Sequence, residues 1–85
     1  MRRIDELTIE IDQTSLELEK TKHELNTLFR QLRTLKKKIE SGIEVDQKEY
    51  EDCVFNNKLL QMKRRRLVTH LKFLNKEFYE ILYWI

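Results

Sequence analysis

Apolar residues recur at alternating steps of three and four along the first half of the chain, from Ile4 to Ile39. Nine of the eleven positions in this series are apolar, and the two exceptions are Thr14 and Thr21. A spacing of this kind, sustained over so many turns, is typical of a coiled coil, because it keeps one narrow apolar seam facing a partner helix. The pattern therefore predicts a long helix over residues 4–41.

The stretch SGIEVDQKEY then interrupts the helical pattern, and it contains the only glycine of the chain. Gly42 comes soon after a run of three lysines, in the position where a left-handed glycine commonly ends a helix. Asp46 and Glu49 have the spacing of a capping box at the start of a new helix, and Val45 and Tyr50 have that of a hydrophobic staple around the same cap. These five residues predict a hinge at which the chain reverses direction.

The 3–4 spacing resumes at Tyr50 and continues to Ile85, with Asn57 and Arg64 as polar interruptions. It predicts a second helix over residues 47–84, with a seam that matches the first in length. A polar residue in such a seam lowers stability but can specify the register or the orientation of the two helices.

The predicted fold class is all-α: a single two-helix antiparallel coiled-coil hairpin with its loop at residues 42–46. Only about four residues join the helices, which is the length of a tight helix–helix connection. One core in a chain of 85 residues gives marginal stability, so we expect self-association or a partner helix to complete the hairpin to a helical bundle. We also expect the chain to be a fragment of a longer coiled-coil protein.

Two antiparallel registers fit the loop, and they differ by one heptad. In the preferred register two glutamates of the first helix face basic side chains of the second, Glu24 facing Lys63 and Glu17 facing His70. In the alternative register Thr14 lies against Phe78.

The second helix carries a further apolar stripe on the side away from its seam. One partner helix cannot cover both sides, and a contiguous exposed apolar stripe usually marks an interaction surface. The chain also becomes aromatic near its C-terminal end, which adds to this surface. The predicted partner-binding residues are Phe55, Leu59, Met62, Arg66, Phe73, Tyr83 and Trp84.

Composition adds little to the predicted fold, but it indicates the cellular compartment in which we expect the protein. Charged residues make up 38% of the chain and hydrophobic residues 40%, which suits long amphipathic helices. The single cysteine excludes an internal disulfide framework and suits a reducing compartment, so we expect a cytoplasmic or otherwise intracellular protein. No segment approaches the run of about 18 apolar residues that a membrane span needs.

Catalytic and ligand-binding motifs are not evident in the sequence. A single glycine cannot build a phosphate-binding loop. His23 and His70 fall on different helices without a ligand set at metal-binding spacing, and Cys53 falls in the seam, where a small buried hydrophobe is the expected role. We therefore expect no enzyme, no catalytic residue, no metal and no cofactor.

A basic segment over residues 58–77 has seven Lys or Arg residues and one acidic residue. When the hairpin folds, this segment lies beside the acidic residues 1–24, and complementary charges along the hairpin are the favoured interpretation. Binding of phosphate or anionic lipid is the alternative. The basic patch consists of Lys58, Lys63, Arg65, Arg66, Lys72 and Lys76.

The favoured function is a non-catalytic protein–protein interaction and oligomerisation module, such as a scaffold, a tether or a cytoskeletal-assembly piece. Its partner would be a second copy, giving a homodimer, or a helix of another protein. The first alternative is a coiled-coil finger that binds a small GTPase as an effector, which rests on analogy of fold alone. The second alternative, which the near-neutral net charge of +2 makes less favoured, is nucleic-acid binding through the basic stripe 58–76.

Overall fold

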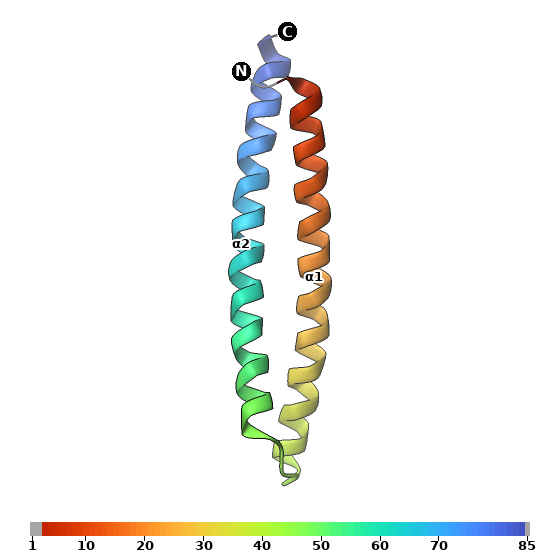
Figure 1. Cartoon of the computed structure of the whole chain (residues 1–85), viewed down its shortest axis with the longest axis vertical. Coiled ribbons are helices and arrows are strands. Elements are labelled where there is room, and N and C mark those ends of the chain that lie inside the picture. Colours follow the sequence, from red (N-terminus) through yellow and green to blue (C-terminus); the bar gives the residue numbers. More distant parts are fainter. Residues whose placement is uncertain (1–2, 85) are drawn as a thin grey trace.

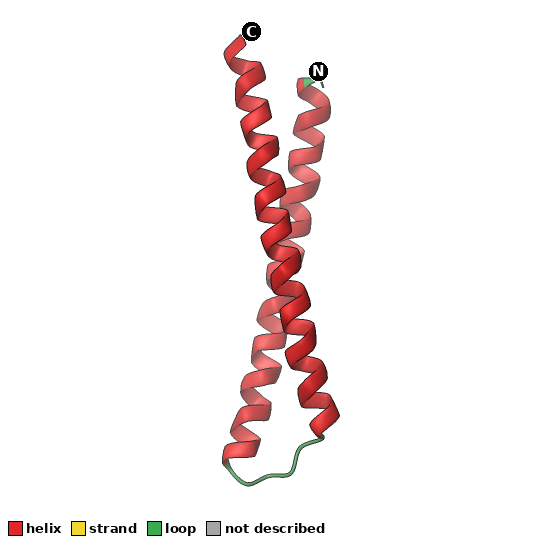
Figure 2. Cartoon of the chain, turned by 90° about the vertical axis from the view of Figure 1, so that its left-hand side faces the viewer, coloured by secondary structure: helices red, strands yellow, loops and turns green. Residues whose placement is uncertain are grey.

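The computed structural model describes residues 3–84, and this part of the chain is a helical hairpin. Helix α1 (Ile4–Glu40) has 37 residues and helix α2 (Gln47–Trp84) has 38. The helices run in opposite directions and form a rod of 64 × 15 × 14 Å (Figure 1). They cross near the middle of the hairpin (Figure 2). Helix α1 ends one residue before the predicted boundary at 41, and the predicted seam residue Ile85 lies outside the described residues.

The buried residues of α1 follow the predicted spacing and lie on the face toward α2. Two of them are threonines, and Thr21 is fully buried. Its hydroxyl donates to the Glu17 carbonyl oxygen at 2.9 Å, so the polar group enters the seam with its hydrogen bond made. Ile39 was predicted in the seam, but it is 47% exposed, since it lies in the last turn of α1 beside the loop. The buried residues of α1 are Leu7, Thr14, Leu18, Thr21, Leu25 and Leu35.

The end of α1 has the backbone geometry that the glycine predicts. Gly42 has φ +76°, the left-handed conformation that only glycine adopts without steric cost. The Gly42 amide donates to the Ile39 carbonyl at 3.0 Å, and the Ile43 amide donates to the Lys38 carbonyl at 2.8 Å. These two bonds form a Schellman motif, which satisfies carbonyls of the last turn and turns the chain away from the helix axis.

Asp46 begins the second helix as its N-cap. Its carboxylate accepts a hydrogen bond from the Lys48 amide at 3.0 Å, and its carbonyl accepts one from the Tyr50 amide at 3.1 Å. Glu49 lies in the first turn, where a negative charge is favoured by the helix dipole. The loop therefore ends one helix and begins the next within six residues, 41–46.

A hydrophobic cluster holds the open end of the hairpin together, far from the loop. Leu7, Leu74 and Ile81 are buried in it. Three partly buried residues pack against them: Ile4, Ile11 and Phe78. The alternative register is therefore wrong, because it would place Phe78 beside Thr14 instead of in the cluster around Leu7.

The charged pairs between the helices differ from the predicted ones by one heptad. The Lys63 Nζ lies 2.6 Å from a Glu17 carboxylate oxygen, and the His70 Nε2 lies 3.3 Å from a Glu10 carboxylate oxygen. Both pairs had been predicted with glutamates one heptad further along α1. The physical reason is that each flanking residue of an antiparallel pair lies between two residues of the other helix. Lys63 bonds Glu17, and the negative charge of Glu24 also helps to raise the pKa of Lys63.

Candidate partner-binding surface

The second apolar stripe of α2 is exposed in the hairpin. Its four apolar side chains have exposed fractions between 47% and 67%. At about 100° per residue, this stripe lies on the side of α2 opposite the seam that packs on α1. We call it the outer stripe, and it consists of Phe55, Leu59, Met62, Arg66 and Phe73.

Aromatic residues extend this exposed surface to the C-terminal end of α2. Tyr83 and Trp84 are 86% and 81% exposed, and their rings meet edge to face at a centroid distance of 6.0 Å. Tyr79 is 68% exposed and contacts the partly buried Phe78 ring at a centroid distance of 6.1 Å. The predicted site omitted Tyr79, although its position just after Phe78 on a helix requires it to point away from the hairpin cluster.

The structure divides the predicted basic patch in two. Lys63 points toward α1, where its hydrogen bond and charge lower the pKa of the Glu17 carboxyl below its usual 4.5. The Glu17 carboxylate in turn raises the pKa of the Lys63 ammonium above its usual 10.5. The remaining members, all exposed, are Lys58, Arg65, Arg66, Lys72 and Lys76.

Of these cations, Lys58, Arg65 and Lys72 lie beside the outer stripe, Arg66 belongs to it, and Lys76 lies one turn beyond Phe73. Arg65, Arg66 and Phe73 line one shallow surface hollow together with Thr69 and His70. A cation and an aromatic ring therefore border the same depression, which gives the surface both apolar area and positive charge. A helical partner with an apolar face and acidic flanks would match both properties.

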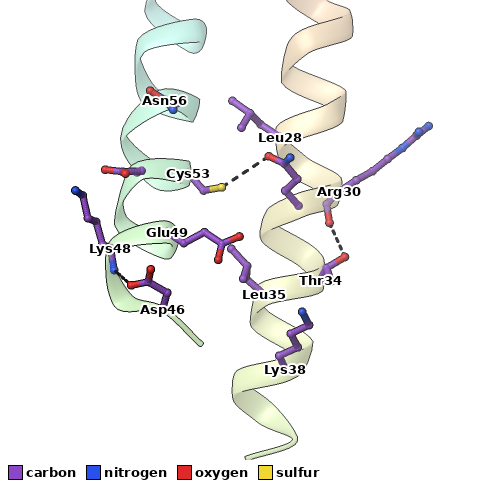
Figure 3. A pocket seen from close by; sticks show the side chains of 12 residues that line it. Leu28, Arg30, Thr34, Leu35, Lys38, Asp46, Lys48, Glu49, Cys53 and Asn56 are labelled. Carbon is purple, nitrogen blue, oxygen red and sulfur yellow. Dashed lines mark hydrogen bonds between the residues drawn. The ribbon is translucent and has the colours of Figure 1, made fainter. Parts of the chain in front are cut away.

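A hollow between the helices lies near the loop (Figure 3). Leu28 and Leu35 line it from α1, and Cys53 and Asn56 line it from α2. The Cys53 thiol donates to the Gln31 Oε1 at 3.8 Å, which is a weak contact. Acidic and basic side chains surround the opening, so the hollow has mixed charge. It is an open groove between helices, and its polar groups do not converge on one point (Figure 3).

The part of the chain that the structure describes has neither a metal-binding cluster nor a membrane-spanning stretch. Within residues 3–84, no three His, Cys, Asp or Glu side chains lie together as a metal site would require. Over the same residues, neither helix has a stretch apolar enough to cross a membrane.

Comparison with protein-family models, with curated proteins and with solved structures found no match for this chain. The site is therefore defined by its residues alone: the outer stripe, its flanking cations and the terminal aromatic residues.

Proposed function

We propose that this hairpin is a non-catalytic protein–protein interaction module that binds a helical partner on the outer stripe of α2. The 3–4 seam between α1 and α2 would pack as a coiled coil, and the partner helix would complete a bundle on the other side of α2. The observation that carries the proposal is the exposure of four large apolar side chains on one face of α2.

The surface area of the hairpin supports this proposal. Its accessible surface is 7050 Å². A compact monomer of 10.5 kDa would expose roughly 5,400 Å². The excess is about twice the roughly 800 Å² that each partner buries in a protein–protein interface of standard size. A partner on the outer stripe would bring the exposed area of the hairpin nearer to that of an ordinary folded protein.

A displayed library of amphipathic helices tests the proposal before any natural partner is identified. The library is panned against the wild-type chain and against a stripe variant carrying Phe55→Ser, Leu59→Ser and Met62→Ser. We expect selected helices to bind the wild type and to lose binding to the stripe variant, because these three side chains supply most of the apolar contact. Binding is measured by biolayer interferometry with the selected helices as synthetic peptides.

A control variant separates the outer stripe from exposed apolar residues in general. It carries Phe29→Ser, Ile39→Ser and Ile43→Ser, which remove three side chains of similar exposure, 48%, 47% and 54%, away from the stripe. The selected helices should bind this control as they bind the wild type. If they bind the stripe variant equally well, the outer stripe is not the binding surface and the proposal is wrong.

A further inference from the structure

A second, smaller apolar patch lies on the outer face of α1. Ile9 and Leu16 are both 58% exposed and are seven residues apart, so they point in the same direction about two turns apart. They lie on the side of α1 that faces away from α2. The hairpin therefore has an outer apolar face on each helix, and the two faces point in opposite directions.

Charges of opposite sign flank these two faces with the same period. On α1 an exposed acidic residue recurs every seven positions beside Ile9 and Leu16, and we call this series the acidic row: Asp5, Asp12 and Glu19. On α2 an exposed basic residue recurs every seven positions beside the outer stripe, and we call this series the basic row: Lys58, Arg65 and Lys72.

The two rows match when the helices that carry them run antiparallel. One heptad forward on α1 then corresponds to one heptad backward on α2, as the Glu10–His70 and Glu17–Lys63 pairs within the hairpin already show. The same rule pairs all three members of the acidic row with the three of the basic row in a single register. These pairs are Asp5 with Lys72, Asp12 with Arg65 and Glu19 with Lys58.

We propose, building on the function proposed above, that the partner on the outer stripe is a second copy of this chain, which docks the outer face of its α1 antiparallel onto α2. Ile9 and Leu16 of one copy would lie on the outer stripe of the next, with the acidic row against the basic row. The apolar contact supplies affinity, and the matched charges fix the direction and the register.

A symmetric pairing of two outer stripes is disfavoured by the same charges. An antiparallel pairing centred on the stripe would bring Arg65 of one copy to Arg65 of the other, and Lys58 to Lys72. Like charges placed opposite each other in this way oppose association. The contact between copies is therefore heterologous, joining different faces.

A heterologous contact leaves one face of each end copy free, so the assembly can grow. Because the docked α1 runs antiparallel to α2, every copy has the same orientation as its neighbour. The product is a row of hairpins side by side. The row becomes a ring if the rotation between neighbouring copies closes it, and otherwise it stays an open filament.

Charge reversal of either row, and then of both, tests this arrangement. The acidic variant carries Asp12→Lys and Glu19→Lys, and the basic variant carries Lys58→Glu and Arg65→Glu. Asp5 is left in place because it stabilises the first turn of α1. Sedimentation velocity in buffer of low ionic strength measures association, and circular dichroism checks that each variant stays helical.

We expect the wild type to form a series of oligomers that shrinks as salt is added, because the matched charges are exposed. Each single-row variant should associate roughly tenfold or more weakly, since two attractive pairs become repulsive. The variant with both rows reversed should regain wild-type association, as should a mixture of the two single-row variants. Recovery of this kind requires the two rows to face each other between copies.

Three outcomes would overturn the inference. A wild-type chain that stays monomeric up to submillimolar concentration has no second copy as its partner. Association that survives reversal of the acidic row uses another face. Failure of the doubly reversed variant to recover excludes the proposed register. A monomeric chain whose outer stripe still binds selected library helices would refute this inference while leaving the proposed function intact.

Discussion

Helices α1 and α2 have almost the same length, but they bury their side chains in different ways. Helix α1 buries six residues along one face and keeps only two large apolar side chains on the opposite face, Ile9 and Leu16. Helix α2 buries only Leu74 and Ile81 to the same degree, although its seam positions are apolar as often as those of α1. Much of its apolar surface lies outside instead, on the outer stripe and the terminal aromatic residues.

This difference shows that the two helices have different roles in one hairpin. The main apolar face of helix α1 is covered by α2, so the contact within the chain already buries it. Helix α2 packs on α1 with one face and leaves the apolar outer stripe exposed on another. In the function proposed above, α1 holds α2 in place and the outer stripe is the surface that a partner would bind.

The largest expected effect comes from two neighbouring residues that lie on opposite faces of α2. Leu74 is 1% exposed and Phe73 is 67% exposed. Leu74→Ala should lower the free energy of unfolding by about 2–4 kcal/mol, because it leaves a cavity in the cluster with Leu7 and Ile81. Phe73→Ala should change it by no more than about 0.5 kcal/mol. Urea unfolding followed by circular dichroism measures both, and equal losses would show that α2 does not have two distinct faces.

A gain in stability is expected from removing a polar group in the α2 seam. The Asn57 Nδ2 is buried and has no hydrogen-bond partner among the described residues, while its Oδ1 accepts from the Gln61 Nε2 at 3.4 Å. An unsatisfied buried donor costs about 1–3 kcal/mol, so Asn57→Leu should stabilise the hairpin by about 1 kcal/mol. The neighbouring exposed Asn56→Leu is the control and should be near neutral. Destabilisation by Asn57→Leu would contradict the assignment of this amide as unsatisfied.

Substitution of Gly42 in the hinge should lower the free energy of unfolding by less than Leu74→Ala does, because it affects only the backbone conformation. A Cβ added at Gly42 meets nothing within 4 Å, so Gly42→Ala costs only the left-handed conformation, about 1 kcal/mol. Gly42→Asn should cost less, because asparagine enters this region more readily. Thermal unfolding of the two variants gives the comparison. An alanine variant as stable as the wild type would mean that the chain can leave α1 without the left-handed turn.

The pair between Glu17 and Lys63 should have the smallest effect, and it depends on pH. Because Lys63 lowers the pKa of Glu17 below 4.5, this contribution is fully present above pH 4.5 and is lost as the pH falls through the lowered pKa. Because Glu17 raises the pKa of Lys63 above 10.5, the second contribution is lost only as the pH rises through the raised pKa.

Unfolding at several pH values measures this effect. Glu17→Gln should reduce the loss of stability in acid, whereas Glu80→Gln, with the same change in charge, should leave it as in the wild type. The effect stays small because both side chains are partly in water, with exposed fractions of 40% and 42%. If Glu17→Gln loses as much stability in acid as the wild type does, the pair contributes nothing in solution.

The helical hairpin was predictable from the sequence for local reasons. The 3–4 spacing determines which side of a helix is apolar, and the single glycine determines where the first helix ends. The pairing of charges was predicted one heptad away from the observed one. Glu17 and Glu24 are both within reach of the long Lys63 side chain, and a pattern read along one helix cannot choose between them.

The outer stripe could also be found from spacing, because Phe55, Leu59 and Met62 fall outside the seam register. The apolar patch on α1 was harder to recognise as a surface, since Ile9 and Leu16 are only two residues on a face that is otherwise polar. The role proposed for them depends on the acidic and basic rows, which lie on opposite outer faces of the folded hairpin. That comparison requires the fold.

The most direct test of the two-faced α2 is urea unfolding of the stripe variant, Phe55→Ser, Leu59→Ser and Met62→Ser, at a concentration where the chain is monomeric. If these residues only serve a partner, the variant should keep the helicity of the wild type, and its unfolding midpoint should change little. A large loss of helicity, or a midpoint as low as that of Leu74→Ala, would show that the outer stripe is part of the core of the hairpin. Helix α2 would then have no separate face for a partner.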